Sequence, residues 1–181
     1  YYNKKKSDVT VWFHGASVGE IMSILPLINE FEKDKKIKKI LLTSSTLSSA
    51  SIIAKKKFKK TIHIYYPFDI GFICNKFLNI WNPKIAIFVD SEIWPNMYKE
   101  INSRKIPLIL INARMTSKSF KRWQIFPSFA KDVFNKITIA LPQNQETKNH
   151  LRILGVKKIN FIGNLKYFKN DKKISKLNIQ K

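Results

Sequence analysis

The residues whose types and spacing could support chemistry begin with the segment HGASVGE, from His14 to Glu20. This segment follows a short β-rich run at 9–13 and precedes residues 21–31, whose apolar side chains recur at helical spacing. We therefore expect a strand, a tight turn and a helix. Ligands of open α/β sheets bind where the strands end, so a turn of small residues with one carboxylate is a candidate ligand site.

Glu20 has a structural interpretation as well as a chemical one. Ser17 and Glu20 have the spacing of a capping box, in which a hydroxyl and a carboxylate satisfy free N–H groups at a helix start. Gly15 and Gly19 favour a ligand site, because glycine lets another molecule approach the backbone closely. The two roles are compatible, and Ser17 and Gly19 are candidate substrate-binding residues.

More polar residues follow two later apolar runs that indicate buried strands. Asp90 and Glu92 follow the first of these runs, and Asn112 and Arg114 follow the second. Parallel strands bring their carboxyl ends to one edge of the sheet, where paired carboxylates and an arginine suit acid/base work and anion binding. The alternative is that Asp90 and Glu92 cap the next helix and that Arg114 is their salt-bridge partner.

The elements that must position these residues alternate between strand and helix about seven times. Such alternation is typical of an α/β fold with a doubly wound parallel sheet. The expected strands are 9–13, 40–43, 61–65, 85–89, 106–111, 137–140 and 159–162, and the expected helices include 21–31, 70–81, 119–136 with a break near Pro127, and 145–154.

Composition restricts the class of protein. A hydrophobic fraction of 44%, with 13% aromatic residues, excludes a disordered chain. The single cysteine, Cys74, excludes a disulfide scaffold and fits a reducing cytoplasm. No apolar run reaches the roughly 18 residues that indicate a membrane-spanning helix. The first residue is Tyr1 rather than methionine, so we expect residues upstream, where a signal or an anchor is possible.

The formal net charge of +22 favours anionic partners such as nucleic acid, phosphorylated ligands or an acidic membrane surface. Only four of the 34 basic residues are arginine, the side chain that best fits phosphate, so a merely lysine-rich surface is the alternative. The lysine-rich segments 33–39, 55–60 and 166–173 fall at expected helix ends and loops, which favours that alternative.

Other candidate sites are weak. His14 and His63 lie on expected strands, where a lone histidine is usually a packed residue. His150 and Cys74 have no partners at metal-ligand spacing, so we expect no metal site. The chain has neither a Walker loop nor a GxGxxG motif, which argues against a triphosphate or dinucleotide site.

Taken together, these motifs closely resemble the N-terminal half of the 3-deoxy-D-manno-octulosonic acid (Kdo) transferases. Their order and spacing match the family across nearly all of residues 9–167. The matching stretches are HGASVGE at 14–20, YYPFD at 65–69, DSEIWPN at 90–96, IPLILINARMTSKS at 106–119, ALPQNQE at 140–146 and GNLKY at 163–167.

The resemblance implies the N-terminal half of a two-domain GT-B glycosyltransferase, with a Rossmann-like parallel sheet flanked by helices. Residues 1–8 would be a truncated lead-in, 9–167 the acceptor-binding domain, and 168–181 a linker towards a C-terminal domain that binds CMP-Kdo. The family transfers Kdo, with inversion and without a metal or other cofactor, to the lipid A precursor (lipid IVA) of lipopolysaccharide. It works on the cytoplasmic face of the bacterial inner membrane, held peripherally or by an anchor.

The resemblance also assigns roles within the site. Glu20 would be the general base, and Asp90 and Lys166 would stabilise the transition state. Ionised Glu20 can accept the proton of the attacking hydroxyl. We expect the helix N-terminus to lower the pKa of Glu20, and desolvation by a bound acceptor to raise it. The family usually has glutamate at Asp90; the shorter aspartate would displace the carboxylate by more than about 1 Å, enough to lower a rate if the placement of this carboxylate is critical.

The competing function is a non-catalytic basic α/β module that binds nucleic acid or phosphorylated ligands. Glu20, Asp90 and Glu92 argue against it, because carboxylates gathered at one edge repel phosphates. We therefore expect no nucleic-acid partner. We also expect this chain alone to transfer no Kdo, because the donor site would lie in the other domain.

Overall fold

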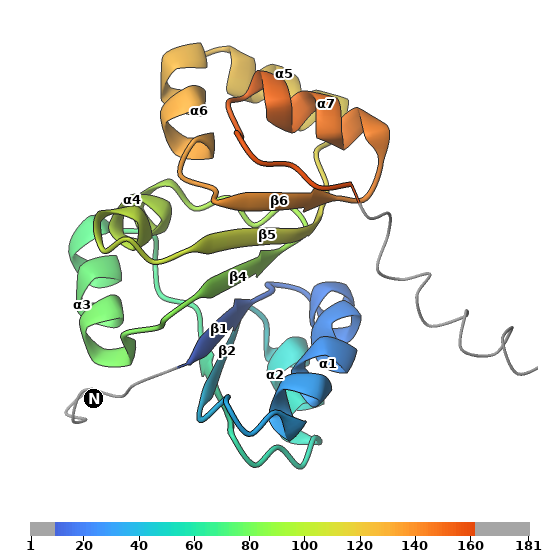
Figure 1. Ribbon diagram of the computed structural model, residues 1–181, viewed down its shortest axis with the longest axis vertical. Helices are drawn as coiled ribbons and strands as arrows, with labels where there is room; N and C mark the ends of the chain where they lie inside the picture. Colours follow the sequence, from blue (N-terminus) through green and yellow to red (C-terminus); the bar gives the residue numbers. More distant parts are fainter. Residues whose placement is uncertain (1–9, 162–181) are drawn as a thin grey trace, which may run out of the picture.

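The first strand, β1 (Val11–His14), organises the sheet, because it pairs in parallel with β2 on one side and with β4 on the other. The computed structural model describes residues 10–161 and places six parallel strands in one sheet, in the order β3-β2-β1-β4-β5-β6 (Figure 1). The other strands are β2 (Ile40–Ser44), β3 (Thr61–Tyr65), β4 (Ala86–Val89), β5 (Leu108–Ala113) and β6 (Ile139–Pro142).

Helices cover both faces of this sheet (Figure 1). Two helices pack on one face, α1 (Val18–Lys33) and α2 (Leu47–Ala54). The remaining helices pack on the other face or beside β6, and they are α3 (Gly71–Trp81), α4 (Pro95–Ser103), α5 (Ser117–Gln124), α6 (Pro127–Phe134) and α7 (Gln145–Ile153).

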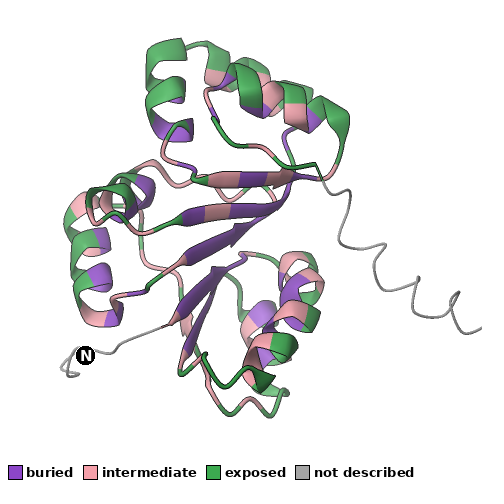
Figure 2. Cartoon of the chain, in the orientation of Figure 1, coloured by how far each residue is buried: buried purple, intermediate pink, exposed green. Residues whose placement is uncertain are grey.

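The alternation of side chains along β1 explains why the strand is buried on both sides. Val11 and Phe13 contribute to the core under α1 and α2, whereas Trp12 contributes to the core under α3 and α4. All four residues of β1 are buried, as are all four of β4, and Figure 2 shows the burial concentrated in these central strands. Strands covered on both faces explain the nearly continuous apolar runs in the sequence.

The predicted fold class, a Rossmann-like parallel α/β sheet flanked by helices, is confirmed. The expected helix at 119–136 is two helices, α5 and α6, because Pro127 begins the second one. The expected strand at 159–162 is reduced, within the described residues, to a single parallel bridge between Ile159 and Ala140. No helix within residues 10–161 has the length and apolarity that crossing a membrane requires.

The alternative that Asp90 and Glu92 cap the helix after β4 is wrong. The N-cap position of α4 is Trp94, whose side chain makes no capping hydrogen bond. Asp69, from the loop after β3, accepts hydrogen bonds from the backbone N–H groups of Asn96 (3.1 Å) and Met97 (2.7 Å) instead. A carboxylate at this position satisfies free donors and complements the helix dipole.

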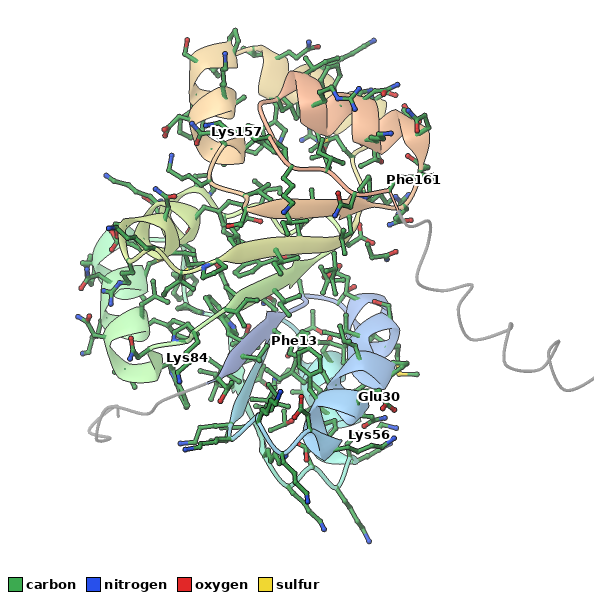
Figure 3. All side chains as sticks on the ribbon, viewed as in Figure 1. Phe13, Glu30, Lys56, Lys84, Lys157 and Phe161 are labelled. Carbon is green, nitrogen blue, oxygen red and sulfur yellow. The ribbon has the colours of Figure 1, made fainter. Side chains whose placement is uncertain are left out.

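The lysines are spread over the molecule rather than gathered in one stripe. Figure 3 shows Lys56, Lys84 and Lys157 at widely separated places, and all three are exposed. Two lysine-rich loops do meet: Lys60, before β3, donates from Nζ to the backbone oxygen of Asp34, after α1 (2.7 Å). The predicted placement of segments 33–39 and 55–60 at helix ends and loops is confirmed.

Replacing Asp69 with alanine is expected to lower the free energy of unfolding by about 1 to 2 kcal/mol, because two backbone donors of α4 lose their acceptor. Urea unfolding followed by circular dichroism measures this change. The control is Lys33→Ala, which breaks an exposed ion pair with Glu30 and should cost about 0.5 kcal/mol or less. Equal effects of the two substitutions would show that Asp69 is not an important cap.

Candidate functional site

Glu20 stands in the first turn of α1, directly after the turn that leaves β1. Its Oε2 accepts a hydrogen bond from the backbone N–H of Ala16 (2.7 Å), and its Oε1 accepts one from the Ser17 hydroxyl (2.9 Å). Ser17 is the N-cap residue of α1 and accepts from the backbone N–H of Glu20 (3.3 Å). The hydroxyl half of the predicted capping box is therefore present, whereas the carboxylate accepts from the residue before the N-cap and is held over the turn.

The two glycines near Glu20, Gly15 and Gly19, have different surroundings. A Cβ on Gly15 would lie 3.2 Å from Cβ of Glu20, so glycine is needed here for close packing against the helix. A Cβ on Gly19 would meet nothing within 4 Å, and Gly19 is exposed. The surface beside Glu20 is thus open to another molecule at Gly19, as the sequence predicted.

The expected lowering of the pKa of Glu20 is wrong in direction. Burial raises the pKa of Glu20 above its ordinary value of 4.5, and the negative charges of Glu92 and Asp90 raise it further. Hydrogen bonds from Ser17 and Ala16 oppose this rise without cancelling it. A carboxylate with a raised pKa is a stronger base when ionised, so burial and neighbouring charge prepare Glu20 for proton abstraction.

Asp90 and Asn112 occupy equivalent places at the ends of neighbouring strands β4 and β5. Both have left-handed backbone conformations, with φ of 62° and 49°. Gln143, which follows β6, donates from Nε2 to the backbone oxygen of Asn112 (2.9 Å) and to Oδ2 of Asp90 (3.5 Å). The side-chain oxygen of Asn112 is buried without a hydrogen-bond partner among the described residues. Three strand ends therefore supply a polar cluster, and its member Asp90 is close enough to Glu20 to influence the pKa of that carboxyl.

Glu92 is more firmly held than the sequence suggested. Its Oε2 lies 3.1 Å from Nε2 of His14 and accepts a hydrogen bond from Nε1 of Trp94 (2.8 Å). Its backbone oxygen accepts from the hydroxyl of Tyr98 (2.8 Å). The side chain is only 13% exposed, so Glu92 is a fixed charge at the edge of the site.

The remaining predicted residues have different outcomes. Arg114 is exposed and takes part in none of the ion pairs within residues 10–161, so it is not the salt-bridge partner of Asp90 or Glu92 in this part of the chain. Lys166 lies outside the described residues, and its predicted role stays a prediction. In the described part of the chain no three His, Cys, Asp or Glu side chains gather as metal ligands.

Two residues of the site were not identified as functional from the sequence. His14 was interpreted as a packed residue, and it is fully buried, but it also binds Glu92. Gln143 was not singled out as a site residue, although it follows the sixth strand just as Asp90 follows the fourth. Its position after a strand end was the available signal.

The geometry can perform base catalysis on a ligand that enters beside Gly19. Glu20 offers a carboxylate that could accept a proton, while Asn112 offers a buried acceptor that a ligand hydroxyl could satisfy. Glu92 and Asp90 are close enough to Glu20 to influence its protonation, which places all three carboxylates at one edge of the sheet. The expected gathering of Glu20 with Asp90 and Glu92 is therefore confirmed.

Comparison with known sequences gives consistent matches. Residues 1–169 match the family described as 3-deoxy-D-manno-octulosonic-acid transferase (kdotransferase). A 3-deoxy-D-manno-octulosonic acid transferase of Rickettsia felis is 36% identical over 162 residues, which cover 90% of this chain and 34% of that protein. The transferase of the same name from Haemophilus influenzae is 28% identical over 159 residues, covering 87% of this chain and 37% of that protein.

Comparison with solved structures supports the fold. A UDP-GlcNAc 2-epimerase from Neisseria meningitidis superposes with a TM-score of 0.60 at 16% identity, covering 96% of this chain and 51% of that one. A putative UDP-N-acetylglucosamine 2-epimerase from Listeria monocytogenes gives 0.60 at 15% identity, covering 89% of this chain and 46% of that one. In each case the similarity extends over about half of the other protein.

Replacing Glu92 with glutamine is expected to lower the pKa of Glu20, because it removes one of the negative charges that raise it. The titration of the Glu20 carboxyl carbon, followed by NMR, measures the change. The control is Glu146→Gln, an exposed carboxylate on α7, which should leave the titration of Glu20 in place. An unchanged pKa of Glu20 in the Glu92 variant would mean that the two carboxylates do not interact.

Proposed function

This chain belongs to the Kdo transferase family, and from that premise we propose that it is the acceptor-side domain of an inverting glycosyltransferase. The reaction transfers Kdo from CMP-Kdo to the lipid A precursor, lipid IVA, during lipopolysaccharide biosynthesis. Because the chain spans little more than a third of the relatives it matches, the donor-binding part is assigned to a domain after this one. The chain alone is expected to transfer no Kdo.

One observation carries this proposal: the half-buried Glu20 lies at the open turn beside Gly19 with a raised pKa. A sugar hydroxyl that attacks an anomeric carbon must lose its proton as the new bond forms. Glu20 would take that proton through an oxygen that now accepts from Ser17 or Ala16. The carboxylate is already oriented by these two donors, so little reorganisation is needed.

The other site residues would hold the acceptor and the developing charge. Asn112 would accept a hydrogen bond from an acceptor hydroxyl, which would satisfy its buried side-chain oxygen. Arg114, exposed next to this edge, would bind an anionic group of the acceptor. Asp90 and Lys166 would stabilise the transition state, with Lys166 offsetting the negative charge of the CMP leaving group or the Kdo carboxylate. No metal ion takes part in the proposed reaction.

A basic module for nucleic acid is the less favoured function. The carboxyl edge of the sheet carries Glu20, Asp90 and Glu92, which would repel a phosphate backbone. Among the described residues, moreover, the exposed lysines Lys56, Lys84 and Lys157 lie at widely separated places (Figure 3).

We also propose that the domain works at the cytoplasmic face of the inner membrane, on an anionic lipid surface. The meeting of the loops 33–39 and 55–60 gathers exposed lysines, including Lys55, Lys56 and Lys57. Lysines close to acidic headgroups contribute about 1 kcal/mol each to binding. The acceptor is itself a phosphorylated lipid, so a bilayer-bound enzyme would meet it without leaving the surface.

Replacing Glu20 with glutamine, in the protein joined to its donor domain, is expected to lower kcat for Kdo transfer by at least about 100-fold. The glutamine amide oxygen can accept from the Ala16 N–H, and its NH2 group can donate to the Ser17 hydroxyl oxygen, so the cap should survive while the base is lost. Transfer from CMP-Kdo to lipid IVA, measured with labelled acceptor, gives the rate. Retained activity would leave Glu20 as a cap alone.

The matched control for this variant is Glu30→Gln, on the exposed side of the same helix (Figure 3), which should retain full activity. Running the unaltered enzyme with excess EDTA tests the metal-independent reaction, and the rate should not change.

A filter-binding assay with DNA at two salt concentrations tests the competing function. Tight, salt-sensitive DNA binding without lipid IVA binding would reverse the ranking.

Replacing the four exposed lysines Lys55, Lys56, Lys57 and Lys59 with serine is expected to weaken binding to vesicles that contain anionic phospholipid by about tenfold or more at low salt. Vesicle sedimentation measures the binding. The control replaces four exposed lysines elsewhere, Lys76, Lys84, Lys99 and Lys121, so that the net charge changes equally. Equal weakening by both sets would mean that total charge, and not this surface, binds the membrane.

A further inference from the structure

His14 is buried at the end of β1 between aromatic rings, and both of its ring nitrogens have partners. The ring stacks on Tyr66 with centroids 3.9 Å apart and meets the edge of Phe88 at 5.1 Å. Its Nε2 lies 3.1 Å from Oε2 of Glu92, and its Nδ1 lies 2.9 Å from Oγ1 of Thr43. The ring therefore connects β2 to the segment after β4, across β1, the strand that precedes the turn leading to Glu20.

The partners of His14 determine which nitrogen carries the proton. The Trp12 indole N–H donates to Oγ1 of Thr43 (3.0 Å), and the hydroxyl proton of Thr43 has two acceptors within reach, Nδ1 of His14 (2.9 Å) and the backbone oxygen of Phe13 (3.3 Å). The shorter contact favours donation to Nδ1. Nδ1 is then the acceptor and Nε2–H is the donor to Glu92. The competing arrangement, Nδ1–H to the backbone oxygen of Thr43, would use the longer contact of 3.3 Å.

The contacts of Glu92 agree with this direction. The indole N–H of Trp94 can only donate, and it donates to the same oxygen, Oε2, that faces His14. Two N–H donors on one oxygen fit a carboxylate rather than a carboxylic acid. Burial lowers the pKa of His14 below its ordinary value of 6.5, and its contacts with Glu92 and Thr43 only oppose this shift. A neutral ring with Nε2–H is consistent with that environment.

We propose that His14 is a positioning residue of the site: as the neutral Nε2–H tautomer, set by Thr43, it holds the Glu92 carboxylate in place beside Glu20. Oε1 of Glu92 makes no hydrogen bond within residues 10–161 and is left for the acceptor. The proposal rests on the proposed function in one respect, the role of Glu20 as base. The position of the Glu92 carboxylate, the second negative charge beside Glu20, then depends on His14, which touches no substrate.

The tautomer can be tested without any assay of activity. The ¹⁵N resonances of the His14 ring, recorded in the full-length protein with labelled histidine, should show a neutral ring protonated at Nε2 through neutral pH. Thr43→Val, which removes the hydroxyl donor, should weaken that preference, whereas Thr43→Ser should keep it. A ring protonated at Nδ1, or doubly protonated at neutral pH, overturns the proposal.

Two substitutions of His14 separate its two contacts. Glutamine places an N–H near the position of Nε2 and can still donate to Glu92, whereas asparagine reaches only as far as Nδ1. We expect His14→Asn to lower kcat for Kdo transfer by about 10- to 100-fold with little change in KM, and His14→Gln to keep most of the activity. Equal kcat values for the two folded variants, whether high or low, overturn the proposal.

His63 supplies the matched control. It lies on β3, half-buried, with Nε2 2.9 Å from the Ser44 hydroxyl, and it is not part of the site. His63→Gln should leave kcat unchanged. Thermal unfolding of each variant shows whether it is folded before its rate is compared. If the unaltered full-length protein transfers no Kdo, the proposed function fails, while the tautomer measurement still decides the assignment of His14.

Discussion

Parallel pairing of β1 with both β2 and β4 is the constraint on which the rest of the structure depends. It directs the carboxyl ends of the strands to the same edge, and with them the turns that carry Glu20, Asp90 and Asn112. It also buries β1 on both faces, so Trp12 and Phe13 stabilise two separate cores from adjacent positions. Residues far apart in the sequence therefore become neighbours at this edge of the sheet, because the parallel strands end there together.

That edge gathers like charges, and the structure manages their repulsion by fixing each carboxylate differently. Glu20 is held by the turn it caps, through Ala16 and Ser17. Glu92 is held by His14 and Trp94, and Asp90 is reached by the side chain of Gln143. Repulsion that would push mobile side chains apart instead raises the proton affinity of Glu20, because none of the three can easily move away. Packing around the three carboxylates thus raises the pKa of Glu20.

The sequence predicts the fold well, because apolar runs and Pro127 report on local structure and burial. It also predicts which strand ends carry polar residues, and hence the gathering of Glu20, Asp90 and Glu92. It does not predict contacts whose partners are distant: His14 and Glu92 are 78 positions apart, and Asp69 lies 27 positions from the helix end it caps. The direction of the pKa shift of Glu20 was missed because burial depends on tertiary packing, whereas the helix dipole is visible locally.

The left-handed backbone of Asp90 gives a physical reason for aspartate at this position. Aspartate tolerates a φ of 62° better than glutamate, since its short side chain can bond to nearby backbone. A longer acid at this place would reach further but would carry more torsional strain. The aspartate thus combines a negative charge at the end of β4 with a main-chain conformation that it adopts at low cost.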